Sequence, residues 1–272
     1  MKMEKLFPLK KGRKVSSMKK PVDKIKSVIS TRLAFLIFFA LYYWGFHFIF
    51  RQTNLQLSQV VFNLAAGVFA GAVVHVAVAK AFGPLLFGRG FCGWACWNAA
   101  VFDLLPIKKV KKKSPESEKY YVYKHIVLAF TLALPLVLIW LGLNFQQPLA
   151  QFKWLLIENA AIYVTGIALA FWLGDRRAFC KYVCPAGALM TMASPRSILK
   201  VEKNHLKCNK CRRCEEVCPM DVPVFNYINA GQRVNHPECI LCAECVKHCP
   251  KNCLTIGIGR KSDTTPDFGR SY

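Results

Sequence analysis

Two runs of cysteine near the C-terminus have the spacing of ligands that hold iron–sulfur clusters. Both fit C-x2-C-x2-C-x3-C-P without deviation, from Cys208 to Pro219 and from Cys239 to Pro250. In proteins with this pattern, three thiolates of a run bind one [4Fe-4S] cluster and the fourth Cys of each run binds the other cluster. The spacing therefore predicts cluster one on Cys208, Cys211, Cys214 and Cys249, and cluster two on Cys239, Cys242, Cys245 and Cys218.

Zinc and disulfides are the alternative uses of these cysteines. Zinc sites typically use two separated Cys pairs rather than runs of four, and a cytoplasmic location disfavours disulfides. Cys253 is left outside both ligand sets. We expect it to be a buried thiol that packs as a small apolar residue, with a redox role as the alternative.

The four cysteines outside this region form two C-x3-C motifs, here termed the hooks: Cys92 with Cys96, and Cys180 with Cys184. The segments Arg89–Cys96 and Arg177–Cys184 align at a constant offset of 88 residues. If a hook is helical, its two thiols lie on one face of the helix. The four thiols predict either one joint site for a further metal centre or a dithiol/disulfide couple at a quinone, with four buried thiols without a redox task as the third alternative.

Four apolar stretches must position these cysteines. Residues 33–50, 60–79 and 126–145 contain no Asp, Glu, Lys or Arg, and residues 154–174 contain only Glu158. About 20 apolar residues cross the hydrocarbon core, so we expect four transmembrane helices. Because both hooks follow a span that runs from outside to inside, the helices are expected to form two parallel repeats related by an axis along the membrane normal.

Charge and composition set the location. The 272-residue chain combines a formal net charge of +23 with 54% hydrophobic residues, which excludes a disordered polycation and argues against a nucleic-acid-binding protein. The cations gather before the first span and between the second and third, so the positive-inside rule predicts a bacterial-type inner-membrane protein with both termini cytoplasmic. We expect membrane lipid, not nucleic acid, to be the partner of these basic tracts.

The predicted domain organisation follows from these features. It consists of a basic cytoplasmic tail (1–32), a helical membrane domain carrying the hooks (33–200), an α+β ferredoxin-like domain with two clusters (201–258) and a polar tail (259–272). Ionisable groups within a membrane are usually functional, so His75 is the candidate quinone or proton site, with haem ligation as an alternative. Arg89 and Arg177 are expected to anchor lipid headgroups or to offset cluster charge.

The combination of four spans, two hooks and a C-terminal two-cluster module resembles the NapH type of ferredoxin-type membrane protein from periplasmic nitrate reductase systems. More loosely, it is similar to the membrane polyferredoxins linked to nitrous oxide reductase maturation and cytochrome oxidase assembly. One position departs from the family pattern, because Trp97 follows Cys96 where Pro185 follows Cys184.

The resemblance implies electron transfer between the quinone/quinol pool and a redox partner or oxidoreductase subunit, with a quinol dehydrogenase subunit as the candidate activity. The alternative is an accessory or regulatory polyferredoxin that supplies electrons for metal reduction or for maturation of an oxidoreductase. The cofactors expected on either interpretation are two [4Fe-4S] clusters, with a further metal centre at the hooks.

Overall fold

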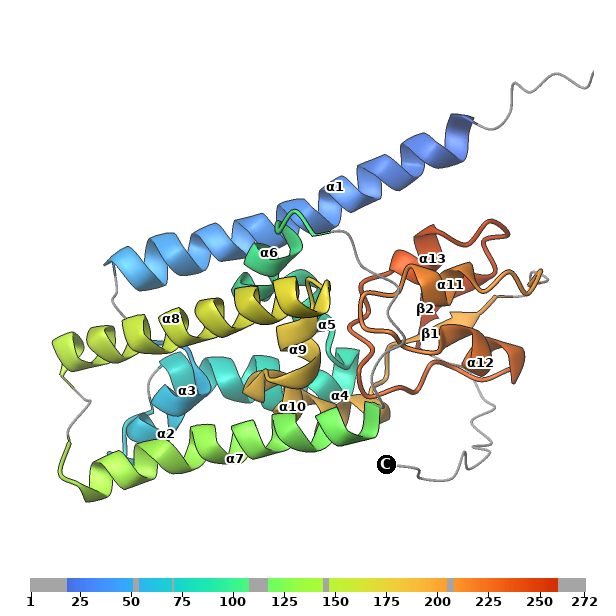
Figure 1. The fold of residues 1–272 in the computed structure, drawn as a ribbon. Coiled ribbons are helices and arrows are strands. Elements are labelled where there is room, and N and C mark those ends of the chain that lie inside the picture. The colour runs from blue at the N-terminus through green and yellow to red at the C-terminus, as the bar shows by residue number, and fades with distance from the viewer. Residues whose placement is uncertain are drawn as a thin grey trace, which may run out of the picture.

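A computed structural model describes residues 19–50, 54–69, 71–107, 117–143, 147–204 and 208–258. These residues form a mostly helical protein (Figure 1). Its longest helices are α1 (Lys19–Tyr42), which continues as the π-helical stretch η1 (Tyr43–Phe50), α7 (Ser117–Trp140) and α8 (Pro148–Leu173). They extend along a similar direction, and the C-terminal domain packs at one end of them (Figure 1).

Three segments of these helices are long and apolar enough to cross a membrane: Thr31–Phe50, Val122–Trp140 and Leu149–Leu173. Their large apolar side chains point outward; Phe38, Phe130 and Phe171 are each 62% exposed. Soluble monomers rarely expose large contiguous apolar surfaces. Such a surface suits contact with lipid, so three of the four expected spans are present as apolar helices of sufficient length.

The second apolar stretch does not form the uninterrupted helix expected over residues 60–79. Helix α2 (Leu57–Ala65) ends at Gly67, whose φ is +68°. The Gly67 N–H donates to the Leu64 carbonyl at 3.0 Å and the Val68 N–H donates to the Asn63 carbonyl at 2.8 Å. This pair of bonds is a Schellman ending, for which glycine is favoured because it adopts positive φ without a steric cost.

A second helical segment begins at Gly71 and continues through α3 (Gly71–His75), η2 (Val76–Phe82) and α4 (Gly83–Phe87). This apolar segment, Gly71–Phe87, is shorter than the three candidate spans. A transmembrane helix needs about 20 predominantly apolar residues to cross the hydrocarbon core. The fourth span therefore stays a prediction. The helical segment found here, Gly71–Phe87, lies nearer to the first hook in the sequence than the expected span 60–79.

Short helices carry the hooks: α5 (Gly90–Trp94), α6 (Trp97–Asp103), α9 (Ala178–Tyr182) and α10 (Pro185–Ala193), followed by the 3-10 turn η3 (Ser194–Arg196). The C-x3-C motifs do not form one continuous helix each, so the condition for placing both thiols on one helix face is not met. Cys92 and Cys180 lie within α5 and α9, whereas Cys96 and Cys184 lie at the N-caps of α6 and α10 with ψ of 117° and 113°. Each hook is thus a helical turn, a break and a new helix start.

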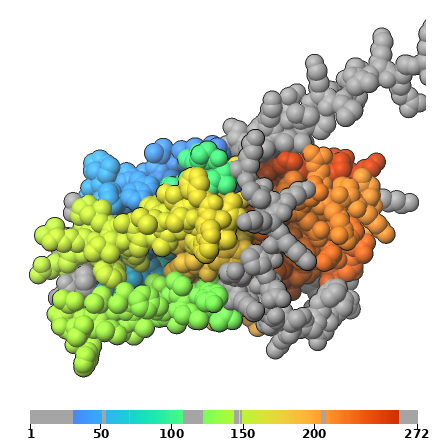
Figure 2. Space-filling view, in the orientation of Figure 1, coloured from blue at the N-terminus to red at the C-terminus, as the bar shows by residue number. Residues whose placement is uncertain are grey.

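The C-terminal domain contains α11 (Arg213–Glu216), α12 (Val224–Asn229), α13 (Glu244–Lys247) and two strands, β1 (Lys200–Lys203) and β2 (Leu254–Gly257). The strands pair antiparallel, with Val201 opposite Ile256. One continuous apolar core joins this domain to the hook region, because Phe102, Phe179 and Met190 belong to the same buried cluster as Val201 and Ile240. The domain forms one end of the molecule (Figure 2).

Candidate metal centres

The four thiols expected to hold cluster two line one cavity in the C-terminal domain. Its wall contains Cys218, Cys239, Cys242 and Cys245 together with apolar side chains that include Val201, Met220 and Ile240. Cys218 thus reaches the thiols of the other run, as the crossed ligand pattern requires. Four thiols around an apolar cavity are a donor set that suits an iron–sulfur cluster.

The two Cys runs share an uncommon backbone conformation. Among the described residues, those other than glycine with positive φ form three pairs, each separated by 31 residues: Lys210 with Leu241, Arg212 with Ala243, and Asp221 with Asn252. Non-glycine residues adopt this conformation infrequently. In the first run it lets the Lys210 N–H donate to the Cys208 Sγ at 3.4 Å. The repeated conformation shows that both runs fold into the same kind of loop.

Burial keeps the Cys239 and Cys242 thiols of the cluster-two set protonated until a metal binds. Loss of solvation raises the pKa of the Cys239 thiol to about 12 and that of the Cys242 thiol to about 11. Metal coordination requires thiolates, so cluster insertion here must release protons.

The cluster-one set is more open to solvent. Cys208, Cys214 and Cys249 are half-buried and Cys211 is exposed. Cys253 is only 2% exposed, and its Sγ lies 3.3 Å from the Cys249 Sγ. Burial raises the pKa of the Cys253 thiol to about 12. Cys253 is therefore a buried, neutral thiol in contact with an expected cluster-one ligand.

The structure brings the two hooks together. The Arg89 Nη2 donates to the Cys180 carbonyl and the Arg177 Nη1 donates to the Cys92 carbonyl, both at 3.2 Å. The thiols are also close enough to interact electrostatically: burial, and then the charges of Cys92, Cys180 and Cys184, raise the pKa of the Cys96 thiol. The four hook cysteines thus occupy one site, although they come from segments 88 residues apart.

Arg89 and Arg177 do not lie at lipid headgroups. They are 0% and 1% exposed, so that alternative for their role is wrong. Burial alone would lower the pKa of each guanidinium, but Glu238 beside Arg89 and Asp103 beside Arg177, together with hook thiols, raise it above its ordinary value. Two buried cations therefore flank the four thiols, each paired with a carboxylate.

The loop of cluster two packs directly on the first hook. A Cβ added to Gly93 would lie 2.3 Å from the Ile240 carbonyl oxygen, so only glycine fits this approach. The Trp94 Nε1 donates to the Leu241 carbonyl at 3.0 Å. Both contacted residues lie between two expected cluster-two ligands, Cys239 and Cys242.

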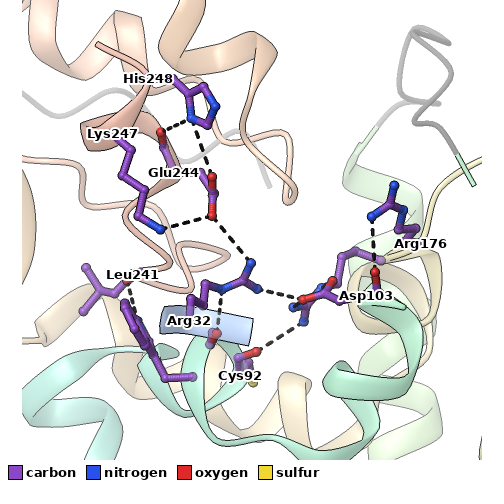
Figure 3. Close-up of polar contacts among 11 residues, drawn as sticks. Arg32, Cys92, Asp103, Arg176, Leu241, Glu244, Lys247 and His248 are labelled. Carbon is purple, nitrogen blue, oxygen red and sulfur yellow. Dashed lines mark hydrogen bonds and ion pairs between the residues drawn. The ribbon is translucent and has the colours of Figure 1, made fainter. Parts of the chain in front are cut away.

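Ion pairs reinforce the same contact. Glu238 pairs with Arg89 and with Lys124 of α7. Arg32 of α1 pairs with Asp103 at 2.9 Å and with Glu244 of the C-terminal domain at 3.6 Å, so its guanidinium lies between the two carboxylates (Figure 3). The C-terminal domain is consequently fixed to the hook region by apolar, hydrogen-bonded and charged contacts.

Aromatic and basic side chains cover the membrane side of the first hook. The His75 ring lies 5.7 Å from both the Phe91 and the Trp97 rings, measured between centroids. Its buried Nε2 and the buried Nε1 of Trp97 have no hydrogen-bond partner in the part of the chain that the structure describes. His75 thus lies beside the first hook.

Several residues of this region were not singled out by sequence reasoning. Lys80 lies one residue beyond the apolar stretch 60–79, and Asp103, Glu238 and Arg32 are isolated charges without a motif. The sequence signal that could have revealed Asp103 and Glu238 is the arginine repeated at the start of each hook. If these arginines are buried, each needs a carboxylate partner. Within the described ranges, no three His, Cys, Asp or Glu side chains are arranged to hold a single metal ion, so the two ferredoxin ligand sets and the joint centre at the hooks all stay predictions.

Family models match both cysteine regions. The 4Fe-4S dicluster domain matches residues 200–250. The 4Fe-4S binding domain matches residues 66–114 and again residues 160–201, which contain the first and the second hook.

Curated relatives have similar sequences over about half of the chain. An uncharacterized protein of Methanocaldococcus jannaschii is 29% identical over 158 residues, 57% of this chain and 59% of that protein. Ferredoxin-type protein NapH of Escherichia coli is 25% identical over 138 residues, 48% of this chain and 47% of NapH. Regulatory protein NosR of Stutzerimonas stutzeri is 27% identical over 177 residues, 56% of this chain and 22% of NosR.

The match thus spans less than two thirds of the length of each of these relatives. No solved structure matches the chain.

Proposed function

Because the chain is similar to ferredoxin-type protein NapH and matches two 4Fe-4S domain models, we propose that it is a NapH-type polyferredoxin that transfers electrons between membrane quinol and a redox partner. The location proposed is a bacterial-type inner membrane, with the hooks and the C-terminal domain on the cytoplasmic side. When bound, [4Fe-4S] clusters supply one-electron transfer, and the protein supplies their spacing and surroundings.

Three ligand sets are proposed. Cys208, Cys211, Cys214 and Cys249 hold cluster one; Cys239, Cys242, Cys245 and Cys218 hold cluster two; and Cys92, Cys96, Cys180 and Cys184 jointly hold a third centre. The third set is supported by the convergence of the hook thiols and by the 4Fe-4S binding domain that matches both hook segments. The matching hook conformations also support two parallel repeats in the membrane domain.

One observation carries the proposed route: the first hook and the cluster-two loop are in van der Waals and hydrogen-bond contact through Gly93 and Trp94. A site beside the membrane helices therefore adjoins the cluster-two ligands without intervening solvent. The exposed Cys211 lies in the cluster-one set, which makes cluster one the site nearest to a soluble partner.

His75 is the proposed quinone or proton site. It lies in the apolar segment Gly71–Phe87, beside the first hook, and its Nε2 is free of partners among the described residues. A neutral imidazole nitrogen can accept the proton that a quinol releases on oxidation.

Quinol-driven reduction tests the proposal. The full-length protein, purified anaerobically and placed in lipid vesicles, is expected to bleach its iron–sulfur absorbance when a quinol is added, and a quinol analogue that cannot be oxidised should leave it unchanged. Reduction by dithionite but not by any quinol would contradict the quinol assignment while leaving the clusters in place.

An accessory role is the second candidate, and the relatives named Regulatory protein NosR favour it. In that role the same clusters would supply electrons for metal reduction or for maturation of an oxidoreductase. Deleting the gene separates the two functions. A relay predicts an assembled but electron-starved oxidoreductase, whereas an accessory protein predicts an oxidoreductase that lacks its metal.

Crossed ligands give the first prediction. Cys214→Ala is expected to remove cluster one, whereas Cys218→Ala, in the same run, is expected to remove cluster two, because the fourth Cys of a run serves the other cluster. Electron paramagnetic resonance of the reduced variants measures which signal is lost. Loss of the same signal in both variants would contradict the crossed arrangement, and stoichiometric zinc without acid-labile sulfide would contradict both clusters.

Topology gives the second prediction. Reporter fusions after Lys20, Lys112 and Tyr272 are expected to score cytoplasmic, and fusions near Asn54 and Gln147 are expected to score outside, because the Lys-rich segments stay on the cytoplasmic side. Paired alkaline phosphatase and green fluorescent protein fusions provide opposite readouts at each site. An external signal at Tyr272 would overturn the proposed orientation.

A further inference from the structure

Lys80 is a buried basic residue beside Trp97, the residue that follows the first hook. Its side chain is 5% exposed, and its Nζ donates to the Leu55 carbonyl at 3.4 Å. In the described part of the chain it forms no ion pair within 4.0 Å, whereas the nearby Arg89 and Arg177 both do. A buried charge is costly unless an opposite charge compensates it, so the position of Lys80 calls for an anionic neighbour.

The hook thiols are that neighbour. Once a metal has displaced their protons, the thiolates of Cys96, Cys184 and Cys92 are the anionic groups that act most strongly on Lys80, ahead of Glu158. Glu158 already accepts hydrogen bonds from Asn54 at 3.1 Å and Ser58 at 2.9 Å. The hook site, with thiols from both halves of the membrane domain, is therefore the principal source of negative charge for the ammonium group.

Trp97 holds Lys80 in this position. The Lys80 Nζ lies 5.3 Å from the centre of the Trp97 ring, a cation–π geometry. The ring is itself fixed, because it stacks on Tyr43 with centroids 3.9 Å apart and planes 5° apart. Trp97 is also the residue that replaces the proline found after Cys184. The first hook therefore differs from the second in having a tryptophan in place of the proline, and this tryptophan is the residue that contacts Lys80.

We propose that Lys80 is the charge partner of the metal centre held by the hooks, and that Trp97 is the residue that positions it. The inference rests on the proposed ligand set Cys92, Cys96, Cys180 and Cys184. One-electron reduction adds one negative charge to a centre already made anionic by four thiolates. A fixed cation nearby stabilises that more negative state by direct electrostatic attraction, so Lys80 raises the reduction potential of the hook centre. Each quinol would then be oxidised to quinone in two one-electron steps, releasing two protons, with the hook centre reoxidised by cluster two between the steps.

A redox titration of the full-length protein tests this role. Lys80→Met removes the charge and substitutes an unbranched apolar side chain of similar length. We expect the equilibrium constant for reduction of the hook centre to fall at least about tenfold, which is about 59 mV for a one-electron couple. Cluster one and cluster two should keep their potentials. The readout is the midpoint potential of each electron paramagnetic resonance signal, which does not depend on turnover.

Two controls separate charge from packing. Lys80→Arg keeps a cation and should retain most of the wild-type potential. Arg196→Met removes an exposed cation of η3 and should leave all potentials unchanged. If Lys80→Met assembles a hook centre with an unchanged potential, or if Lys80→Arg shifts it equally, the charge-partner role is wrong.

Loss of the hook centre in Lys80→Met but not in Lys80→Arg would support the role, because the cation would then be needed for assembly. If Lys80→Met does not fold, Trp97→Leu decides: a smaller potential shift in the same direction supports positioning by the ring, and no shift contradicts it. A wild-type protein that holds only the iron of two clusters would instead refute the proposed hook centre itself, independently of Lys80.

Discussion

Cys92→Ala combined with Cys180→Ala is expected to abolish quinol-driven reduction while leaving both ferredoxin clusters reducible by dithionite. The double variant removes one thiol from each hook, and the remaining pair, Cys96 and Cys184, cannot complete a four-thiolate site. Iron should fall by about four atoms per chain, the content of one [4Fe-4S] cluster. Iron and acid-labile sulfide analysis, with quinol and dithionite titrations on one preparation, measures both effects.

Met190→Leu is the matched control for this experiment. The Met190 Sδ lies 3.6 Å from the Cys92 Sγ, and the side chain is fully buried, so the substitution perturbs packing at the same place without removing an expected ligand. It should keep normal iron content. A Cys92→Ala, Cys180→Ala protein with normal iron and normal quinol-driven reduction would falsify the joint hook centre.

Gly93→Ala is expected to uncouple the hook site from cluster two. The new Cβ would lie 2.3 Å from the Ile240 carbonyl oxygen, so the cluster-two loop must move away. Overpacking of this kind costs about 1–3 kcal/mol, which corresponds to a roughly 5- to 150-fold loss of docked domain at equilibrium. Quinol should still reduce the hook centre, but onward reduction of the ferredoxin clusters should slow strongly, as rapid-freeze paramagnetic resonance would show.

Gly45→Ala provides the matched glycine substitution, because a Cβ at Gly45 meets no atom within 4 Å. It should transfer electrons at the wild-type rate. Both variants should hold the same iron. Equal transfer rates in Gly93→Ala and Gly45→Ala would show that electrons do not pass through the contact between the first hook and the cluster-two loop.

The chemistry of the protein was the part most accessible from sequence. Ligand spacing is a local property of the chain, so the Cys runs predict clusters without knowledge of the fold, and the family models match the same region. The three long apolar helices were accessible for a similar reason, because lipid contact requires an uninterrupted apolar surface. The burial of Arg89 and Arg177 could not be predicted from sequence, because a cation next to an apolar helix is equally typical of a residue that contacts lipid headgroups.

The second apolar stretch could either continue as one helix or end at Gly67, and its composition does not show which of the two is favoured. Residues 60–79 contain no Asp, Glu, Lys or Arg, yet Gly67 allows the chain to end α2 by adopting a positive φ. A helix continuing through Gly67 would have the same hydropathy. Only the packing of α2, with polar side chains such as Gln59 and Asn63 fully buried, favours the ending over continuation.

The break inside each hook was similarly hidden. A C-x3-C spacing fits one helix face, but Cys96 and Cys184 instead cap new helices, and the Gly187 N–H donates to the Cys184 Sγ at 3.3 Å. The Cys184 thiol thus caps its helix, whereas Cys96 occupies the N-cap position without a side-chain cap hydrogen bond. The repeated motif predicted that the four cysteines come together, but the spacing alone could not show whether each hook is one helix or two.

The crossed arginines have a consequence for the biogenesis of the protein. Arg89 bonds a carbonyl of the second hook and Arg177 bonds a carbonyl of the first. During synthesis Arg89 is made long before Cys180 and Glu238, the groups that satisfy it once it is buried. The early half of the membrane domain therefore cannot reach its final packing alone. A metal centre that needs thiols from both hooks can likewise be completed only after the second hook has been synthesised.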